Sequence, residues 1–221
     1  MVSRAQFFDG DDTAKWAGEA ARQLETYPPG QENGGAEFRI WSERYGVSKE
    51  ATAYDFGCGT GLARPGFSGM RYVGIDQNPA MIAGFRQRWL ERDPQVSVYT
   101  SPLNQILQNH PHLAQTGDVG CFLTVLQHNH WETAAEILDQ AYGVLRPGAF
   151  LFLVEATFNE KHYPAETRRK YGLPDPIDPE RLACVDGGAV FTYKGWCHFL
   201  RRHGFEVVDY DGDCGYVALR R

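Results

Sequence analysis

The chain has 221 residues, 43% of them hydrophobic, and a formal net charge of −6 at pH 7. This length suits one α/β domain with a substantial core, and the acidic balance gives no support for a polyanionic partner such as a nucleic acid. No apolar run approaches the roughly 18 residues that a membrane span needs, and the polar segment Met1–Gln6 does not open a secretory signal.

The five cysteines are scattered along the chain and no two have the C-x-x-C spacing of a metal or redox motif. Reduced thiols in a cytoplasmic protein are the simplest explanation of such a set. The pairs His110/His112 and His128/His130 have alternate spacing, but no third ligand accompanies either pair. No metal site is therefore expected.

Two helical segments precede the repeating part of the chain. Apolar residues recur at helical spacing in 13–24 and 36–45, and proline- and glycine-rich sequence separates the two segments. We expect residues 1–48 to form an N-terminal helical cap on a single domain that spans 1–221.

Strands alternate with helices from residue 51 onward. Strands are predicted at 51–56, 71–75, 96–100, 118–126 and 149–154, and the longer helices at 79–90 and 131–145. Such alternation predicts a parallel sheet with helices on both faces. The run 149–154 is nearly all apolar, as expected of a strand buried on both sides.

The last part of the chain has a different pattern. A helix is predicted at 195–203 and two strands at 205–210 and 215–219, and a short turn between those strands makes them antiparallel. Before them, the proline-rich and aromatic segment 156–193 is too long for a simple connection, so it is predicted to be a functional insert that caps a substrate.

The most informative motif is Asp55-Phe56-Gly57-Cys58-Gly59-Thr60-Gly61, directly after the first predicted strand. Three glycines at alternate positions allow a sharp turn without Cβ atoms, so that a ligand can lie on the main chain. Asp76 ends the second predicted strand, where a carboxylate can accept both hydroxyls of a ribose. These features together indicate a nucleoside-binding site.

The competing interpretation is the dinucleotide fingerprint G-x-G-x-x-G/A. From Gly57 its third glycine would fall at position 62, which is Leu62. That glycine lets a helix pack closely under a pyrophosphate. Its absence favours a nucleoside ligand without a diphosphate.

The pattern D-x-G-x-G-x-G, followed by a hydrophobic strand that ends in Gly74-Ile75-Asp76, resembles the class I S-adenosylmethionine-dependent methyltransferases. The resemblance covers about 50–155 through motifs and about 195–221 through topology. It implies a Rossmann-like three-layer α/β sandwich. Its mostly parallel seven-stranded sheet would close in a C-terminal antiparallel hairpin, with the last strand inserted beside the fifth.

The resemblance also implies which residues bind S-adenosylmethionine. The three glycines would approach its methionine part, Asp76 would hold its ribose, and Asp55 would orient the loop or reach its amino group. Met81 lies near the adenosine or belongs to the core, and Ser101 stands where many relatives have an acidic residue. The full set of expected cofactor contacts is Asp55, Gly57, Gly59, Gly61, Asp76, Gln77, Met81, Ser101 and Leu123.

Methyl transfer from a sulfonium releases a neutral leaving group, so alignment of the reacting atoms matters most. A base is needed only if the acceptor must lose a proton. His128 and Glu155 are the catalytic candidates at the carboxyl edge of the predicted sheet. His128 can instead be a structural histidine at a helix entry, and Glu155 a structural cap.

We therefore expect a biosynthetic enzyme that methylates an oxygen, nitrogen or carbon atom of a small molecule, without membrane or nucleic-acid partners. One alternative is an RNA or protein methyltransferase, although no N-P-P-Y type motif follows the fourth strand. The other is a fold relative that binds S-adenosylmethionine without transferring its methyl group.

Overall fold

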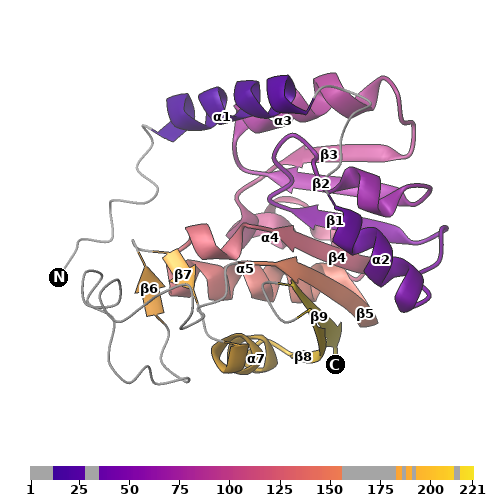
Figure 1. Cartoon of the computed structure of the whole chain (residues 1–221), viewed down its shortest axis with the longest axis vertical. Helices are drawn as coiled ribbons and strands as arrows, with labels where there is room; N and C mark the ends of the chain where they lie inside the picture. Colours follow the sequence, from indigo (N-terminus) through magenta and orange to yellow (C-terminus); the bar gives the residue numbers. More distant parts are fainter. Residues whose placement is uncertain (1–11, 28–34, 156–182, 186–187, 191–192, 212–214) are drawn as a thin grey trace.

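The computed structural model describes residues 12–27, 35–155, 183–185, 188–190, 193–211 and 215–221. In this part of the chain seven strands form one sheet (Figure 1). They are β1 (Thr52–Phe56), β2 (Arg71–Asp76), β3 (Val96–Thr100), β4 (Gly117–Leu123), β5 (Leu145–Val154), β8 (Phe205–Tyr210) and β9 (Gly215–Arg220).

The strand order is β3-β2-β1-β4-β5-β9-β8. Strands β1 to β5 pair in parallel, whereas β9 is antiparallel to both of its neighbours, β5 and β8. The mostly parallel seven-stranded sheet with a C-terminal antiparallel hairpin, predicted from the sequence, is confirmed. Because the order reverses between β1 and β4, the carboxyl ends of these strands form the switch point at which such sheets bind ligands.

Helices cover both faces of the sheet. The described α-helices are α1 (Asp12–Thr26), α2 (Ala36–Arg44), α3 (Pro79–Phe85), α4 (Ile106–Asn109), α5 (Trp131–Val144) and α7 (Tyr193–Arg202). Short helical turns are η1 (Arg64–Phe67), η2 (Arg86–Leu90), η3 (Leu103–Gln105), η4 (Pro111–Leu113) and η5 (Leu126–His128). A small separate hairpin consists of β6 (Ala183–Val185) and β7 (Gly188–Val190).

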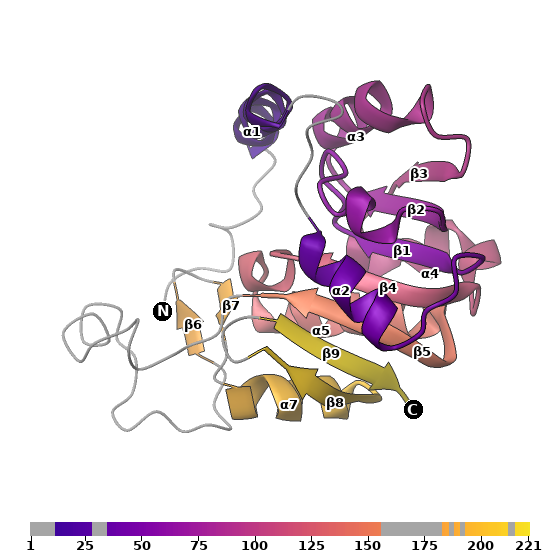
Figure 2. The ribbon, with the colours of Figure 1, turned by 45° about the vertical axis from the view of Figure 1, so that its right-hand side comes forward.

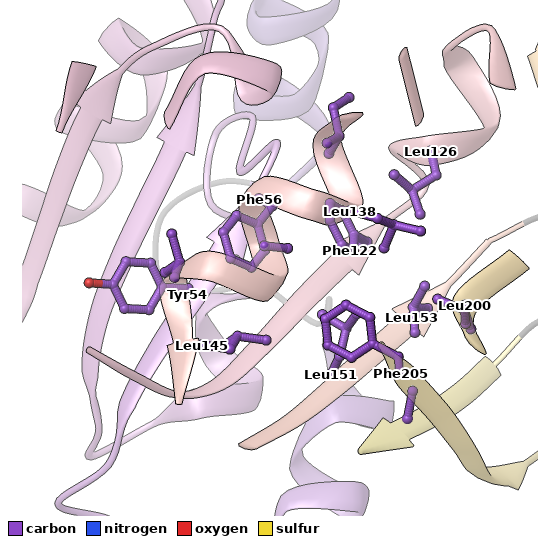
Figure 3. Close-up of a cluster of buried hydrophobic side chains, with 14 of the residues drawn as sticks. Tyr54, Phe56, Phe122, Leu126, Leu138, Leu145, Leu151, Leu153, Leu200 and Phe205 are labelled. Atoms are coloured by element: carbon purple, nitrogen blue, oxygen red, sulfur yellow. The ribbon is translucent and has the colours of Figure 1, made fainter. Parts of the chain in front are cut away.

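The core has two layers, one on each face of the sheet. Successive residues of β5 point alternately into one layer and the other. Leu151 and Leu153 are buried against α5 and α7, in the layer drawn in Figure 3. Phe152 points to the other side, where it stacks on Phe38 of α2 and Phe67 of η1. Side chains of a strand alternate between faces, and both faces of this strand are covered. This explains why its sequence is apolar from Ala149 to Val154.

Helix α1 lies beside α3 in both views (Figures 1 and 2). The buried guanidinium of Arg88 in η2 donates to the carbonyl oxygens of Gln23 and Tyr27, at 3.0 and 2.8 Å. A cation at the carboxyl end of a helix satisfies its last carbonyl groups. Arg88 therefore anchors α1 beside the carboxyl edge of the sheet. None of the described helices is long and apolar enough to cross a membrane.

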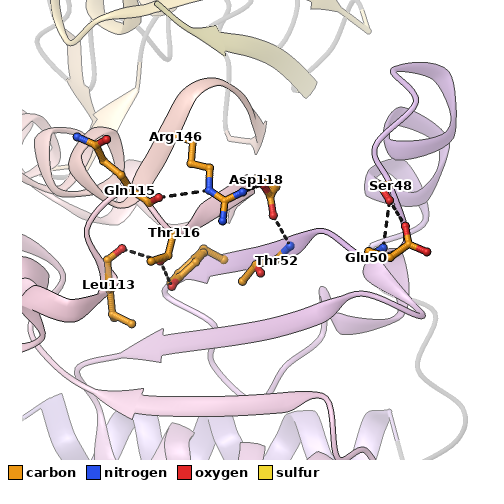
Figure 4. Close-up of polar contacts among 9 residues, drawn as sticks. Ser48, Glu50, Thr52, Leu113, Gln115, Thr116, Asp118 and Arg146 are labelled. Carbon is orange, nitrogen blue, oxygen red and sulfur yellow. Dashed lines mark hydrogen bonds and ion pairs between the residues drawn. The ribbon is translucent and has the colours of Figure 1, made fainter.

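The amino edge of the sheet, opposite the switch point, is closed by a polar network (Figure 4). The Asp118 carboxylate accepts from the Thr52 backbone N–H at 2.8 Å and from the Arg146 guanidinium at 2.7 Å. Thr116 donates its hydroxyl to the carbonyl of Leu113 at 2.7 Å. The two bonds of Asp118 join β1, β4 and β5 at their beginnings, and the bond of Thr116 ties the start of β4 to η4.

Strand β4 is shorter than predicted. It ends at Leu123, and Thr124 has a left-handed backbone with φ +56°. That turn leads directly into η5, so residues 124–126 do not continue the strand. The reversal brings η5 and His128 over the carboxyl edge of the sheet.

Candidate active site

A cavity of about 680 Å³ opens at the carboxyl ends of β1, β2 and β4, at the switch in strand order. Its size is in the range of small-molecule sites. Its lining is Trp16, Glu19, Gln23, Gly57, Gly59, Asp76, Gln77, Asn78, Met81, Pro102, Leu103, Asn104, Leu123, Thr124, Val125, His128, Asn129, Thr133 and Ile137.

The glycine turn after β1 forms the floor of the cavity. Gly57 has φ +79°, and a methyl group there would lie 2.6 Å from Cγ2 of Val125. Gly59 has φ +51° with no atom closer than 3.7 Å to the place of a methyl group, so its side is open to the cavity. The backbone N–H groups of Gly57 and Cys58 donate to Ile75 of β2 at 2.8 and 3.0 Å. The turn is thus tied to the neighbouring strand.

Gly61 was expected to approach the cofactor, but the structure places it outside the cavity lining. A methyl group there would overlap the indole of Trp89, whose Nε1 donates to the Gly61 carbonyl at 3.1 Å. The third glycine therefore lets the loop pack on η2.

Asp76 holds the end of β2 and the glycine turn together. One carboxylate oxygen accepts from the Gly59 N–H at 2.9 Å, and the other accepts from the Asn78 N–H at 2.8 Å. Burial raises the pKa of Asp76, while these N–H groups oppose the rise. Each carboxylate oxygen has more than one lone pair, so Asp76 can also accept from hydroxyl groups of a ligand in the cavity.

Two further expected contacts also line the cavity next to Asp76. Gln77 is exposed at its rim, and Met81 is buried with its sulfur facing Gly59. Asn78 caps α3 by accepting from the N–H groups of Ala80 and Met81, at 2.9 and 3.3 Å. This cap fixes where Met81 enters the site.

Asp55 was expected at the cofactor, but it lies outside the cavity lining, in the core beneath the turn. Its side chain is 1% exposed, and its carboxylate accepts from the Tyr72 hydroxyl and from Cys121 Sγ. Burial raises the pKa of Asp55 to about 7. Its position suits the other expected role, that of orienting the loop.

Ser101 likewise lies outside the cavity lining, although it was expected to be a cofactor contact. It is buried, donates its hydroxyl to the Pro102 carbonyl and accepts from the Asn109 amide. Its backbone N–H donates to the Asp76 carbonyl at 2.9 Å. Pro102, Leu103 and Asn104 line the cavity in its place, and their position directly after β3 is the sequence signal that could have indicated them.

The two catalytic candidates have different surroundings. His128 lines the cavity, and its imidazole meets the indole of Trp16 edge-on, with ring centroids 6.4 Å apart. Glu155 is fully buried beneath η5 and does not line the cavity. Its carboxylate accepts from three consecutive backbone N–H groups, which fits the structural alternative instead of the role of a base.

Helix α1 contributes three lining residues, Trp16, Glu19 and Gln23, which share one face of the helix. Gln23 accepts a hydrogen bond from the Thr60 hydroxyl at 2.8 Å, and Glu19 forms a salt bridge with Arg22. The sequence indicated the stripe that contains Trp16 and Gln23 but not its partner surface. Glu19 and Gln23 were therefore missed as site residues.

The cavity is acidic. Among the described residues that line it, Glu19 and Asp76 are the acidic side chains, and none is a lysine or arginine. Such a lining suits a neutral or cationic ligand and gives a diphosphate no partner of opposite charge. Nor do the described residues bring together three His, Cys, Asp or Glu side chains that could hold a metal ion.

The sequence from 53 to 148 matches the family model described as a methyltransferase domain. This match and the sheet topology support a class I S-adenosylmethionine-dependent methyltransferase. The matched segment contains the glycine turn, Asp76, β3, β4 and η5, so it includes most of the cavity of this methyltransferase. A search of curated protein sequences found no match.

Solved structures share the fold of the methyltransferase. An S-adenosylmethionine-dependent methyltransferase from Methanosarcina mazei is 20% identical, with 80% of this chain and 94% of the other covered and a TM-score of 0.59. The Burkholderia thailandensis 1,6-didemethyltoxoflavin-N1-methyltransferase, solved with S-adenosylhomocysteine, is 18% identical, with coverage of 98% and 91% and a TM-score of 0.58. The [4+2]-cyclase SpnF is 16% identical, with coverage of 94% and 93% and a TM-score of 0.65.

The cavity of the methyltransferase fits S-adenosylmethionine, the cofactor of its family. The sulfonium and ammonium groups of this cofactor are cationic, and it has no phosphate. An acidic cavity with an open glycine turn and the Asp76 carboxylate has matching chemistry. Gly57, Gly59, Asp76, Gln77, Met81 and Leu123 are the expected contacts that the structure brings to this cavity.

Proposed function

We propose that this methyltransferase transfers a methyl group from S-adenosylmethionine to an oxygen, nitrogen or carbon atom of a small biosynthetic molecule. The observation that carries the proposal is the single cavity in which Asp76, hydrogen-bonded to the Gly59 turn, lies with His128 and Trp16. A donor site and a site for an acceptor are thereby contiguous.

Two residues of α1 mark the two ends of the cavity. Gln23 is bonded to Thr60 of the glycine turn, whereas Trp16, about two turns earlier, contacts His128. In this proposal the cofactor lies over Gly57 and Gly59, and the acceptor binds toward Trp16 and His128.

When bound, the cofactor supplies a methyl group that is activated by a sulfonium, and loss of this methyl group turns the sulfonium into a neutral thioether. The protein then has to align the acceptor and keep water out. His128 is the side chain at the acceptor end that can take a proton from a hydroxyl or an amine. Glu155 is not assigned that task, because its carboxylate is occupied by backbone N–H groups outside the cavity.

A single domain with two caps remains part of the proposal. The cap at 1–48 includes α1 and α2, and the cap at 156–193 includes the β6–β7 hairpin and the beginning of α7. Strand β7 contacts η5 and α5, beside the proposed acceptor end. Residues 1–11, 28–34 and most of 156–192 lie outside the described part of the chain.

Methyl-labelled S-adenosylmethionine can test the function. The protein is incubated with the label and separately with small-molecule, RNA and protein fractions of a cell extract. We expect label in a small molecule, and less of it with the variant Asp76→Ala. Label in RNA or protein would favour the first alternative. Calorimetric binding of S-adenosylhomocysteine with no labelled product in any fraction would favour the second, and no binding at all would refute the proposal.

A further inference from the structure

The end of β5 holds a buried acid that the transfer reaction does not use directly. Glu155 follows β5 immediately and is 0% exposed. Its Oε1 accepts from the N–H groups of Val125 and Leu126, both at 2.8 Å, and its Oε2 accepts from the N–H of Gln127 at 3.1 Å. Three adjacent N–H groups at the start of a helical turn are a favourable environment for one carboxylate.

The backbone segment that Glu155 holds borders the cavity at two places, one on either side of the held N–H groups. Val125 contacts the floor, because its methyl groups occupy the space in which Gly57 would carry a side chain. His128 follows three residues later, where its ring meets Trp16. A shift of this backbone would therefore move the floor and the acceptor end together.

We propose that Glu155 is a positioning residue, whose buried carboxylate fixes the backbone of Val125–Gln127 and thereby sets the places of Val125 and His128 at the cavity. The consequence for methyl transfer rests on the function proposed above. The positioning itself can be measured without any methyl acceptor. The positioning role of Glu155 and the proposed function can therefore be refuted separately.

The variants Glu155→Gln and Glu155→Ala separate positioning from general stability. The glutamine keeps an oxygen that can accept from Val125 and Leu126, but its amide group faces the Gln127 N–H as a second donor. The alanine removes all three bonds. The matched control is Asp118→Asn, because Asp118 also accepts from a backbone N–H but lies at the opposite edge of the sheet.

Amide hydrogen exchange and calorimetry with S-adenosylhomocysteine are the measurements. We expect Glu155→Ala to speed exchange at Val125, Leu126 and Gln127 by about tenfold or more, and to weaken the affinity about threefold to tenfold. Glu155→Gln should speed exchange mainly at Gln127 and recover most of the affinity. The Asp118→Asn control should leave these three amides and the affinity within about twofold of wild type.

Two results would overturn the proposal. One is unchanged exchange at all three amides in both Glu155 variants. The other is faster exchange spread evenly over β4 and β5, which would make Glu155 a general stabiliser of the fold. If Glu155→Ala does not fold, the exchange rate of the Gln127 amide in Glu155→Gln is the deciding measurement. Failure of wild-type protein to bind S-adenosylhomocysteine would refute the proposed function but would leave the exchange result intact.

Discussion

The Asp76 carboxylate accepts a hydrogen bond from the Gly59 backbone N–H at 2.9 Å, so the acidic end of β2 and the turn after β1 are one unit. A ligand that is bound by Asp76 therefore also depends on the shape of the turn. This coupling sets the expected effect of changing the acid.

Replacing Asp76 should impair binding of the cofactor. Asp76→Ala removes the acceptor for a ligand hydroxyl pair and releases the Gly59 N–H, so we expect a loss of roughly 1–3 kcal/mol in affinity for S-adenosylhomocysteine. Calorimetry measures this loss, with Asp118→Asn as the control. An affinity equal to wild type would exclude Asp76 as a cofactor ligand.

The glycines of the turn should differ in their tolerance of alanine. At Gly61 the added methyl group meets Trp89 and the backbone has φ +83°, so Gly61→Ala should cost about 2–4 kcal/mol of folding free energy. At Gly59 only the positive φ opposes the change, which predicts a cost of about 1–2 kcal/mol. Denaturant titration of both variants compares them. Equal losses would contradict the assignment of Gly61 to packing.

Two buried acids should make folding stability fall as pH rises. Burial raises the pKa of Asp55 and of Glu155 to about 7 in the folded chain, above their ordinary values. Between the ordinary value and 7 the folded state holds protons that the unfolded state has lost. The stability that each proton contributes is therefore present at low pH, declines as pH rises toward 7, and is absent above it.

Each of the two acids can contribute on the order of 3 kcal/mol to this decline. The variant Asp55→Asn keeps an oxygen that can accept from Tyr72 but cannot ionise. Denaturant titrations at pH 5 and pH 8 should show a smaller difference for Asp55→Asn than for wild type. An identical difference in the two proteins would show that Asp55 keeps its ordinary pKa.

His128 should matter for turnover more than for cofactor binding. If His128 removes a proton from the acceptor, His128→Ala should lower the rate of labelling by about 10²–10⁴-fold while the affinity for S-adenosylhomocysteine stays within about threefold. His130→Ala is the matched control, since His130 is close by in sequence but does not line the cavity. Unchanged labelling by His128→Ala would remove His128 from the mechanism.

The sequence predicted the sheet well because its signals were local. The glycine turn, the apolar strands and the short turn between β8 and β9 each identify one element and its neighbours. The parallel order and the closing hairpin then follow from connection rules. The position of Gly57 and Asp76 at the carboxyl edge of that framework could be predicted for the same reason.

The side chains for which the sequence left two roles open depend on contacts distant in sequence. Asp55 faces Tyr72 and Cys121, and Glu155 faces the backbone of η5, and neither partner can be inferred from the strand on which the acid lies. Alternation along a strand gives two possible faces but does not say which one borders a cavity. In the same way Gln23 of α1 became a site residue only through its contact with Thr60.

The position of β9 bears on how the chain is synthesised. Because β9 pairs with β5 on one side and β8 on the other, β5 has an unpaired edge until residues 215–220 have left the ribosome. Open edges of this kind recruit strands from other chains. The nascent protein is thus prone to aggregation in the interval between the emergence of β5 and that of β9, when chaperones would help its yield.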